Sequence, residues 1–411
     1  MSEVSYDIAV IGGGASGMAA ALEAKRTDGH LKIAVIERLP RVGKKLLATG
    51  NGRCNITNMR ATQADYHGLD NSFVNEALKK YPPIRVIGRF SEWGLECIEE
   101  DEGRVYPVSS QAASVLDVLR LTMKEQGIGE LCGVRITGIR KSGKGVLLMT
   151  ETGNIFAKKV IIACGGQAAP ALSGCGDGYR LLEQLGHKTG KRVPALVQLK
   201  CDTEGLSALK GVRCECGIDI LVNGKKQRSE DGELLFTEYG VSGIAVMQLS
   251  RIAATALAEK KNVTLNIRFT GSEIYEKLLR RREALKARSL EDFLTGMINK
   301  RLGQIMIKRA TGLQLSEKAG ALTDAQLNSI ASLLSGFPVH VVGTQGFEQA
   351  QVTAGGVLTK DFDASTMMSK IAENVYACGE VLDIDGDCGG YNLQWAWASG
   401  MLAGKSAAEK R

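Results

Sequence analysis

The sequence lacks several features that would assign it to particular classes of protein. Its 10 cysteines include no C-x-x-C or C-x4-C pair, which argues against a flavin disulfide reductase and indicates reduced cytoplasmic thiols. Its four histidines form neither an H-E-x-x-H motif nor an H-x3–5-H pair, so we expect no metal site. It contains no apolar run of about 20 residues and no visible signal peptide. We therefore expect a cytoplasmic protein without a membrane span.

Composition indicates a large soluble protein with many positions where backbone can approach a ligand. The 411 residues are enough for two or three domains, and glycine (49 residues) greatly outweighs the 5% aromatic content. The formal net charge of +7 is mild for this length and does not by itself indicate nucleic acid as a partner.

The beginning of the chain has the pattern of a dinucleotide-binding βαβ unit. A strand-like run at 7–11 leads into Gly12-Gly13-Gly14-Ala15-Ser16-Gly17, and a second run at 33–36 ends in Glu37. Gly12 permits the tight turn, Gly14 lets the backbone approach a pyrophosphate, and Gly17 lets the helix lie close to the sheet. The helix N-terminus then presents unpaired N–H groups to the phosphates, and Glu37 accepts hydrogen bonds from ribose.

The sequence pattern along the chain predicts a cofactor domain interrupted by an insert. Residues 1–190 and 346–411 read as α/β and form one discontinuous FAD-binding domain, and 191–270 with 335–345 form a β-rich substrate domain whose Asn223-Gly224 predicts a hairpin. The helical subdomain at 271–334 shows its polar helical pattern from Ser272 onward. Shorter elements are expected as helices near 72–92, 111–126 and 177–186, as strands near 134–136, 146–149, 159–164 and 374–378, and as a closing helix from 391.

Three features favour FAD over NAD as the dinucleotide. Gly379-Glu380 ends a buried strand, as an acid that binds a ribitol hydroxyl would. Gly389-Gly390-Tyr391-Asn392 opens a helix whose positive N-terminal end favours a reduced, anionic flavin. The chain has only one complete dinucleotide fingerprint, because Gly174-Cys175-Gly176 is not followed by a strand and an acid.

Longer motifs resemble a bacterial family of FAD-dependent oxidoreductases that includes aminoacetone-oxidase-like flavoproteins and bile-acid flavin reductases. The resemblance rests on residues 44–55 (KKLLATGNGRCN), on residues 379–397 and on Leu235-Phe236-Thr237-Glu238-Tyr239-Gly240. The family often has His in place of Glu238 and Pro in place of Ile244. The match covers essentially the whole chain.

The resemblance implies an α/β fold: a Rossmann-like FAD-binding domain of the glutathione-reductase type, with a β-barrel insert and a helical subdomain. Carried over position by position, and joined with the glycine motifs above, it implies these cofactor-binding residues: Gly12, Gly14, Ala15, Gly17, Glu37, Arg38, Lys45, Gly52, Arg53, Cys54, Asn55, Val134, Ala163, Gly165, Gly379, Glu380, Gly390, Tyr391, Asn392 and Leu393.

Catalytic residues are less well marked. Arg53 either contacts the cofactor, which we favour, or polarises a substrate carbonyl. Tyr391 either stacks near the flavin, donates a proton, or is a buried structural tyrosine bonded to backbone. Trp395 and Trp397 stand at i and i+2 on the closing helix and do not share a face, so we expect one in the core and one beside the pocket. Cys54 and Cys388 are expected to be packing residues rather than redox groups.

We therefore expect an FAD-dependent oxidoreductase of a small organic substrate. The resemblance favours NAD(P)H-driven reduction of a C=C bond conjugated to a ketone, as in oxo-bile-acid or steroid-like compounds. The alternative is an amine oxidase of the aminoacetone type that produces hydrogen peroxide. A flavin-containing nucleic-acid-binding protein is a further alternative, because residues 268–309 hold eleven Lys and Arg against five acids. Without interleaved aromatics we favour a solvated helix face there.

Overall fold

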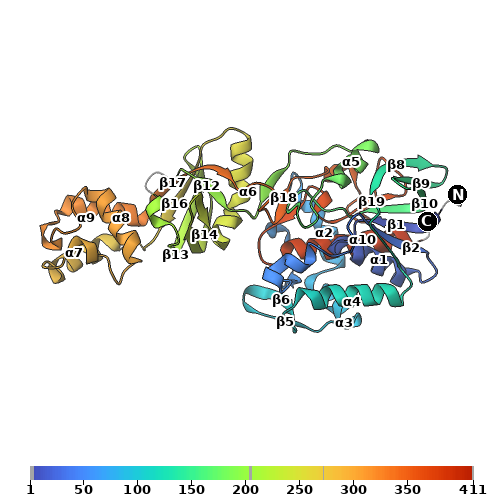
Figure 1. Ribbon diagram of the computed structural model, residues 1–411, viewed down its shortest axis with the longest axis horizontal. Helices are drawn as coiled ribbons and strands as arrows, with labels where there is room; N and C mark the ends of the chain where they lie inside the picture. Colours follow the sequence, from blue (N-terminus) through green and yellow to red (C-terminus); the bar gives the residue numbers. More distant parts are fainter. Residues whose placement is uncertain (1–3, 203–205, 272, 410–411) are drawn as a thin grey trace. The chain divides into compact units, whose positions relative to one another are not determined.

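The computed structural model describes residues 4–202, 206–271 and 273–409. Ser272, the first residue of the expected polar helical pattern, lies outside these ranges. The chain divides into two compact units, Met1–Arg192 with Gln351–Arg411, and Val193–Ala350 (Figure 1). Each unit has its own hydrophobic core.

The first unit is built on a mainly parallel sheet with β1 (Val4–Ile11) in its interior. The strand order is β7-β2-β1-β10-β9-β8, with β2 (Ile33–Glu37) and β10 (Asn154–Ile162) both parallel to β1. The first half of β10 pairs with β9 (Gly145–Thr150), and its second half pairs with β19 (Val375–Ala377). All five residues of β2 are buried, as expected for a strand covered on both faces. The remaining strands are β7 (Gly129–Cys132) and β8 (Ile136–Ser142).

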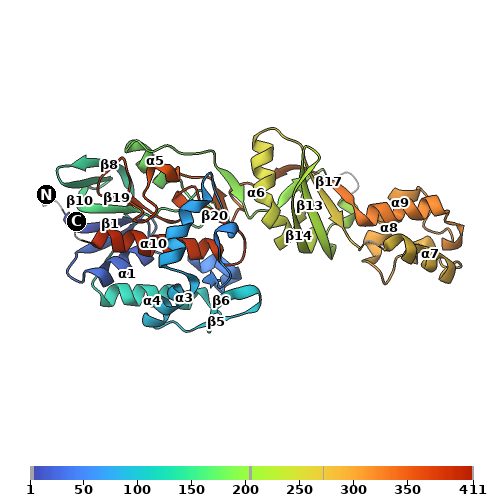
Figure 2. The ribbon, with the colours of Figure 1, turned by 180° about the vertical axis from the view of Figure 1, so that it is seen from behind.

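Two helices far apart in the sequence pack against each other in this unit. Both views show α1 (Ala15–Thr27) beside α10 (Tyr391–Ala408) (Figures 1 and 2). A Cβ on Gly400 would lie 2.3 Å from the Ser16 carbonyl oxygen, and one on Gly404 would lie 2.0 Å from that of Ala20. The two helices therefore run parallel with their backbones in contact. Because Gly400 lies level with Ser16, α10 begins about 13 Å before that level, measured along the helix axis.

The rest of the unit covers the sheet and braces the start of α10. The expected helix near 72–92 is two helices, α2 (Asn75–Lys80) and α3 (Pro83–Glu92), because the Pro82-Pro83 pair interrupts the hydrogen bonding and starts a new helix. The other elements are α4 (Ala112–Glu125), α5 (Asp177–Gln184), β3 (Thr57–Asn58), β4 (Tyr66–His67), β5 (Cys97–Glu99), β6 (Arg104–Pro107), β18 (Val352–Ala354) and β20 (Asp385–Gly386).

The second unit is a closed barrel with helices packed into the same core. The strand order is β12-β15-β14-β13-β16-β17. The predicted Asn223-Gly224 hairpin is confirmed, because both residues have the positive φ of a type I′ turn and join two paired strands. The strands are β12 (Leu199–Cys201), β13 (Arg213–Val222), β14 (Lys225–Phe236), β15 (Gly240–Ser242), β16 (Val263–Arg268) and β17 (Phe337–Thr344), and β11 (Val193–Ala195) precedes them.

The helices of this unit are only partly as expected. The polar helical segment contains α7 (Ile274–Ala284), α8 (Lys300–Thr311) and α9 (Asp324–Ser335). In addition, α6 (Ile244–Ala258) lies inside the stretch that we expected to be β-rich. Its sequence is apolar on most sides, so its periodicity did not distinguish a buried helix from strands.

Candidate functional site

The glycine turn after β1 leaves the N-terminus of α1 free to receive an anion. Gly12 has φ +107°, and a Cβ on it would lie 2.4 Å from the carbonyl oxygen of Ala163. A Cβ on Gly17 would lie 1.9 Å from the carbonyl oxygen of Gly12. Gly14 is the N-cap of α1 and supplies no side-chain cap, so the first-turn N–H groups, including that of Ala15, are available to a phosphate.

The acid at the end of β2 is held directly beside this turn. Glu37 is buried; its Oε2 accepts from Gly13 N–H at 2.9 Å and its Oε1 accepts from Leu39 N–H at 2.9 Å. Each carboxylate oxygen keeps a second lone pair for a ribose hydroxyl. The Val134 N–H donates to the Glu37 carbonyl at 3.0 Å, whereas the neighbouring Arg38 donates to Ser173 O at 2.9 Å.

Several of the expected cofactor residues border open space. A Cβ added to Gly14, Gly52 or Gly165 would meet no heavy atom within 4 Å. Ala163, another expected residue, donates its N–H to Ile11 O at 2.8 Å. Gly52 and Gly165 have φ of +85° and +69°, and like Gly14 they leave room beside the backbone. A ligand can approach the backbone at these three positions, and this fits a dinucleotide lying across the carboxyl ends of the strands.

The C-terminal part of the chain contributes a second set of groups next to the glycine turn. Lys45 Nζ forms an ion pair with Glu380 Oε2 at 2.9 Å, and Glu380 Oε1 accepts from Thr353 N–H at 2.9 Å. Gly379 has φ +74°, and a Cβ there would lie 2.6 Å from Ser16 Oγ. Lys45 and Glu380, 335 residues apart, are thus brought together at the start of α1.

The start of α10 has the same free helix end as α1. Its N-cap, Gly390, has φ +103° and no side-chain cap. The Asn392 side chain holds the preceding loop by accepting from Gly386 N–H at 2.8 Å and donating to Gly386 O at 2.7 Å and Asp387 O at 3.1 Å. The first-turn N–H groups of α10, including that of Leu393, can stabilise negative charge on a bound group.

Tyr391 is the first residue of α10 and keeps a phenol that no described residue hydrogen-bonds. The buried Tyr66 packs edge-to-face on it with ring centroids 6.4 Å apart, and Tyr66 Oη donates to Tyr391 O at 3.1 Å. Burial raises the pKa of Tyr391, with Asp65 and Asp387 adding to the rise, while Arg60 and Arg104 oppose it. The phenol is therefore protonated near neutral pH and can donate a proton.

Arg53 is paired within the protein, and its neighbours Cys54 and Asn55 are buried. The Arg53 guanidinium pairs with the Glu100 carboxylate and lies 4.1 Å from the centroid of Tyr106, so the structure shows it bound to protein groups. Burial raises the pKa of Cys54 to about 12, which makes it a packing thiol at neutral pH. Asn55 Oδ1 is buried without a hydrogen-bond partner among the described residues, beside Gly390.

The expectation for the two tryptophans is wrong. Trp395 and Trp397 are both buried, at 2% and 0% exposure. Trp397 Nε1 donates to Ile56 O at 2.9 Å, and Trp395 packs edge-to-face on Phe73. Since α10 is covered on nearly all sides, residues at i and i+2 both enter the core.

Sequence reasoning missed three groups that shape this region. Thr353 Oγ1 accepts from Gln167 N–H at 2.8 Å and Ala168 N–H at 3.0 Å, and thereby fixes the loop after β10. Asn58 joins the loop before α10 to the turn before β6, and Arg104 lies beside it. The Gly355-Gly356 pair after Thr353 was an available signal; no motif marks Asn58 or Arg104.

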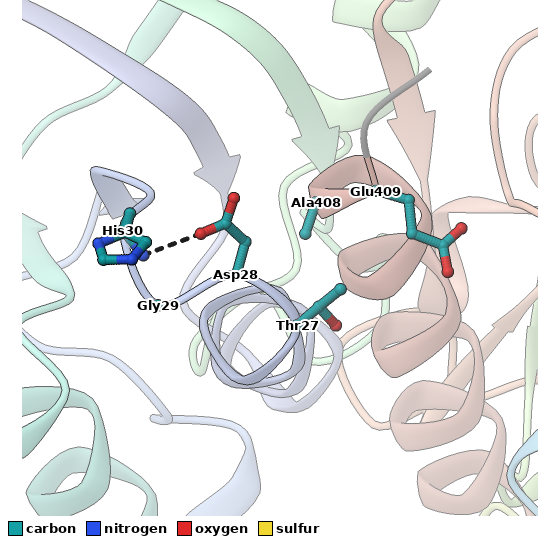
Figure 3. A pocket seen from close by; sticks show the side chains of 6 residues that line it. All are labelled: Thr27, Asp28, Gly29, His30, Ala408 and Glu409. Carbon is teal, nitrogen blue, oxygen red and sulfur yellow. Dashed lines mark hydrogen bonds between the residues drawn. The ribbon is translucent and has the colours of Figure 1, made fainter.

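Features elsewhere in the described part of the molecule add no groups to this site. Figure 3 shows a surface depression at the C-terminal ends of α1 and α10, where His30 N–H donates to Asp28 Oδ1 at 2.9 Å; it lies at the end of α1 opposite the glycine turn. The described residues contain no cluster of three or more His, Cys, Asp or Glu that could hold a metal. All ten cysteines are free thiols. Among the described residues, no helix has the length and apolar character needed to cross a bilayer.

Comparisons with known proteins agree with this geometry. The family described as "HI0933-like protein Rossmann domain" matches residues 6–406. The 3-dehydro-bile acid delta(4,6)-reductase of Clostridium scindens is 37% identical over 407 residues, which cover 98% of this chain and 99% of the relative. The ribosomal RNA dihydrouridine synthases of Haemophilus influenzae and Escherichia coli are 27% and 28% identical, over 97% and 98% of this chain and 97% and 99% of their own lengths.

Among solved structures the likeness concerns the fold. A 3-ketosteroid-delta4-(5alpha)-dehydrogenase from Rhodococcus jostii RHA1 superposes with a TM-score of 0.50 and 15% identity, and covers 99% of this chain and 97% of its own. A quinol-fumarate reductase gives 0.51 and 16% identity, over 99% of this chain and 71% of its own. The predicted fold class is confirmed: a Rossmann-like domain with a closed barrel and a helical part.

Proposed function

The chain belongs to the HI0933-like Rossmann-domain family and is an FAD-dependent oxidoreductase, and from this premise we propose that it reduces a carbon–carbon double bond conjugated to a ketone, using NAD(P)H as the electron donor. An oxo-bile acid or a similar steroid-like compound is the proposed substrate, because the relative that shares 37% of its residues over nearly the whole chain is a bile-acid reductase. A cytoplasmic location is part of the proposal, since all ten cysteines are free thiols.

One observation carries this proposal. Two uncapped helix N-termini, those of α1 and α10, belong to parallel helices of one unit, and Gly14 at the first of them borders open space. The first end suits a pyrophosphate and the second suits a ring that becomes anionic on reduction. We propose that FAD is held by the residues expected from the sequence, with Glu37 on the ribose, Gly14 and Ala15 at the pyrophosphate, and Asn392 and Leu393 at the ring.

When bound, FAD supplies the hydride chemistry. The residues of the chain have the remaining tasks. The first-turn N–H groups of α10 stabilise negative charge near the reacting atoms, as donors aimed at a developing charge do in other enzymes. Tyr391 holds a proton at Oη and delivers it to the carbon next to the ketone. Arg53 forms an ion pair with Glu100, and no role in this step is assigned to it.

An anaerobic experiment tests the proposal. Purified yellow protein is reduced with NADH or NADPH, and its reoxidation is followed after adding a 3-oxo-4-ene bile acid. We expect the flavin spectrum to return to the oxidised form, with one saturated ketone formed per flavin. Aminoacetone in air is the control for the amine-oxidase alternative, and rapid peroxide formation with no reoxidation by the enone would refute the reductase proposal.

A second candidate is reduction of uridine in ribosomal RNA, the reaction for which two relatives are named. Uracil contains a C=C bond conjugated to a carbonyl, so the chemical step is of the same class. One observation favours it: the helical part of the second unit exposes eight cations with no ion pair among the described residues, namely Lys277, Arg280, Lys286, Arg288, Arg301, Lys308, Arg309 and Lys318. Other cations there are paired, such as Arg282 with Asp324 and Lys300 with Asp292.

Binding of an rRNA hairpin tests this second candidate. If it holds, log K falls steeply with log salt, and replacing three of these cations with Gln lowers the slope by about two to three. If no binding appears at 50 mM salt, or the slope is unchanged in the variant, the exposed cations form a solvated surface and the small-molecule proposal stands alone.

A further inference from the structure

Two arginines that no motif marks lie next to the start of α10, one on strand β6 of a small sheet and the other in the turn that follows strand β3. Asn58 of β3 and Arg104 of β6 are paired across the two strands, and Arg60 follows Asn58 by two residues. Met59 N–H donates to Gly103 O at 2.7 Å, and a Cβ on Gly103 would lie 3.1 Å from Arg60 Cγ. Arg60 and Arg104 are therefore neighbours on adjacent segments.

This sheet is fastened to the residues that precede Tyr391. Asn58 is 2% exposed; its Nδ2 donates to Gly389 O at 2.9 Å and to Glu102 O at 3.2 Å, and its Oδ1 accepts from Arg60 N–H at 2.9 Å. A Cβ on Gly390 would lie 2.6 Å from the Thr57 carbonyl. One buried amide thus fixes the backbones of Arg60 and Gly389 relative to each other.

Arg60 and Arg104 both interact electrostatically with the Tyr391 phenol. Each opposes the rise in the pKa of Tyr391 that burial causes. Arg60 is exposed and forms no ion pair with any described residue. Arg104 pairs with Glu102, whose side chain is 64% exposed, and such exposed pairs add little and exchange readily. Both guanidinium groups can therefore turn to a ligand.

We propose that Arg60 and Arg104 form a subsite for an oxyanion of the substrate, beside Tyr391. Each guanidinium offers a planar fork of N–H donors that matches the two oxygens of a carboxylate or phosphate. The inference deepens the proposed function: the substrate carries an acidic group, and the pair orients it so that its double bond lies near the Tyr391 proton. The acidic group is a carboxylate if the substrate is a carboxylated steroid, and a phosphate if it is a nucleotide.

Equilibrium binding tests this without turnover. The probes are 3-oxo-4-cholenoic acid against its methyl ester, and uridine 5′-monophosphate against uridine, measured by calorimetry on the flavin-loaded wild type. We expect one acid to bind at least about tenfold more tightly than its neutral partner, and R60Q and R104Q each to remove most of that preference. R60K restores part of it. R140Q is the matched control, because Arg140 is exposed on β8 without an ion pair among the described residues, and it keeps the preference.

The outcomes separate the subsite from the function. A preference in the steroid pair assigns a carboxylate, and one in the uridine pair assigns a phosphate. If neither acid is preferred, or if R60Q and R104Q bind both members of each pair as the wild type does, the subsite is refuted even when the enzyme reduces enones. If the preference exists and the arginines carry it but no enone is reduced, the subsite stands and the reductase proposal falls. KM for the acid rises in the variants while KM for the ester does not.

Discussion

The contact between α1 and α10 makes a prediction whose sign depends on backbone geometry alone. In Gly400→Ala the new methyl group would lie 2.3 Å from Ser16 O, where ordinary contact needs about 3.4 Å, so the helices must separate by the difference of about 1.1 Å. A gap of that size forfeits a quarter to a half of each dispersion contact along the alanine-rich interface of α1. We expect the free energy of unfolding of the first unit to fall by about 1–3 kcal/mol.

The same substitution elsewhere in the unit is the matched control. Gly88 is exposed in the middle of α3, and a Cβ there would meet no heavy atom within 4 Å. Gly88→Ala should therefore raise the free energy of unfolding by about 0.5–1 kcal/mol, the difference in helix propensity between the two residues. One methyl group then has opposite effects at the two glycines.

Tryptophan fluorescence in urea measures the stability of the first unit in both variants. All three tryptophans, Trp93, Trp395 and Trp397, belong to the first unit, so the signal reports its unfolding and not that of the barrel. The midpoint should fall by roughly 0.5–1 M in Gly400→Ala, given a typical dependence on urea, and rise slightly in Gly88→Ala. A Gly400→Ala protein as stable as the wild type would show that α1 and α10 are not in backbone contact.

Four further predictions concern cofactor, catalysis, thiols and pH. Glu37→Gln removes charged acceptors from the ribose site, and FAD retention measured by equilibrium dialysis should weaken on the order of tenfold. Tyr391→Phe should lower the rate of enone reduction in single turnovers by about 10²–10⁴ while the flavin content is unchanged; an unchanged rate would exclude Tyr391 as the proton donor. A hydrogen bond from Cys216 lowers the pKa of Cys214, whereas burial raises that of Cys54 to about 12. Iodoacetamide at pH 8, read by mass spectrometry, should therefore label Cys214 first and Cys54 only after unfolding. The Asp219 carboxyl has a pKa held below its usual value because hydrogen bonds from Arg268, Lys226 and Ser229 outweigh the effect of burial. Its contribution to barrel stability is present above the unfolded pKa of about 3.9 and is lost as pH falls toward the folded value, and far-UV circular dichroism in urea at pH 2–6 checks this.

The parts of the fold that depend on local backbone requirements were predictable from the sequence. The βαβ unit, the Asn223-Gly224 hairpin and the start of α10 at Tyr391 each need glycine or a turn residue at a fixed place, and the pattern shows it. Where tertiary burial decides, the pattern misled: α6 was not expected, and both tryptophans of α10 are in the core.

The candidate site likewise has one half that the sequence predicts and one half that it does not. Its cofactor half is made of main-chain groups, which glycines and helix ends bring together, so a sequence motif describes it. Its other half is made of side chains on short strands and on the turn after β3, with no motif. Only the pairing of Asn58 with Arg104 and the hydrogen bonds of Asn58 with Gly389 and Arg60 place Arg60 near Tyr391. Members of one family can therefore share the chemical step and differ in substrate, because substitutions in the second half leave the first half intact. It follows that variants at Arg60 and Arg104 should change which molecule is reduced before they change whether FAD is held.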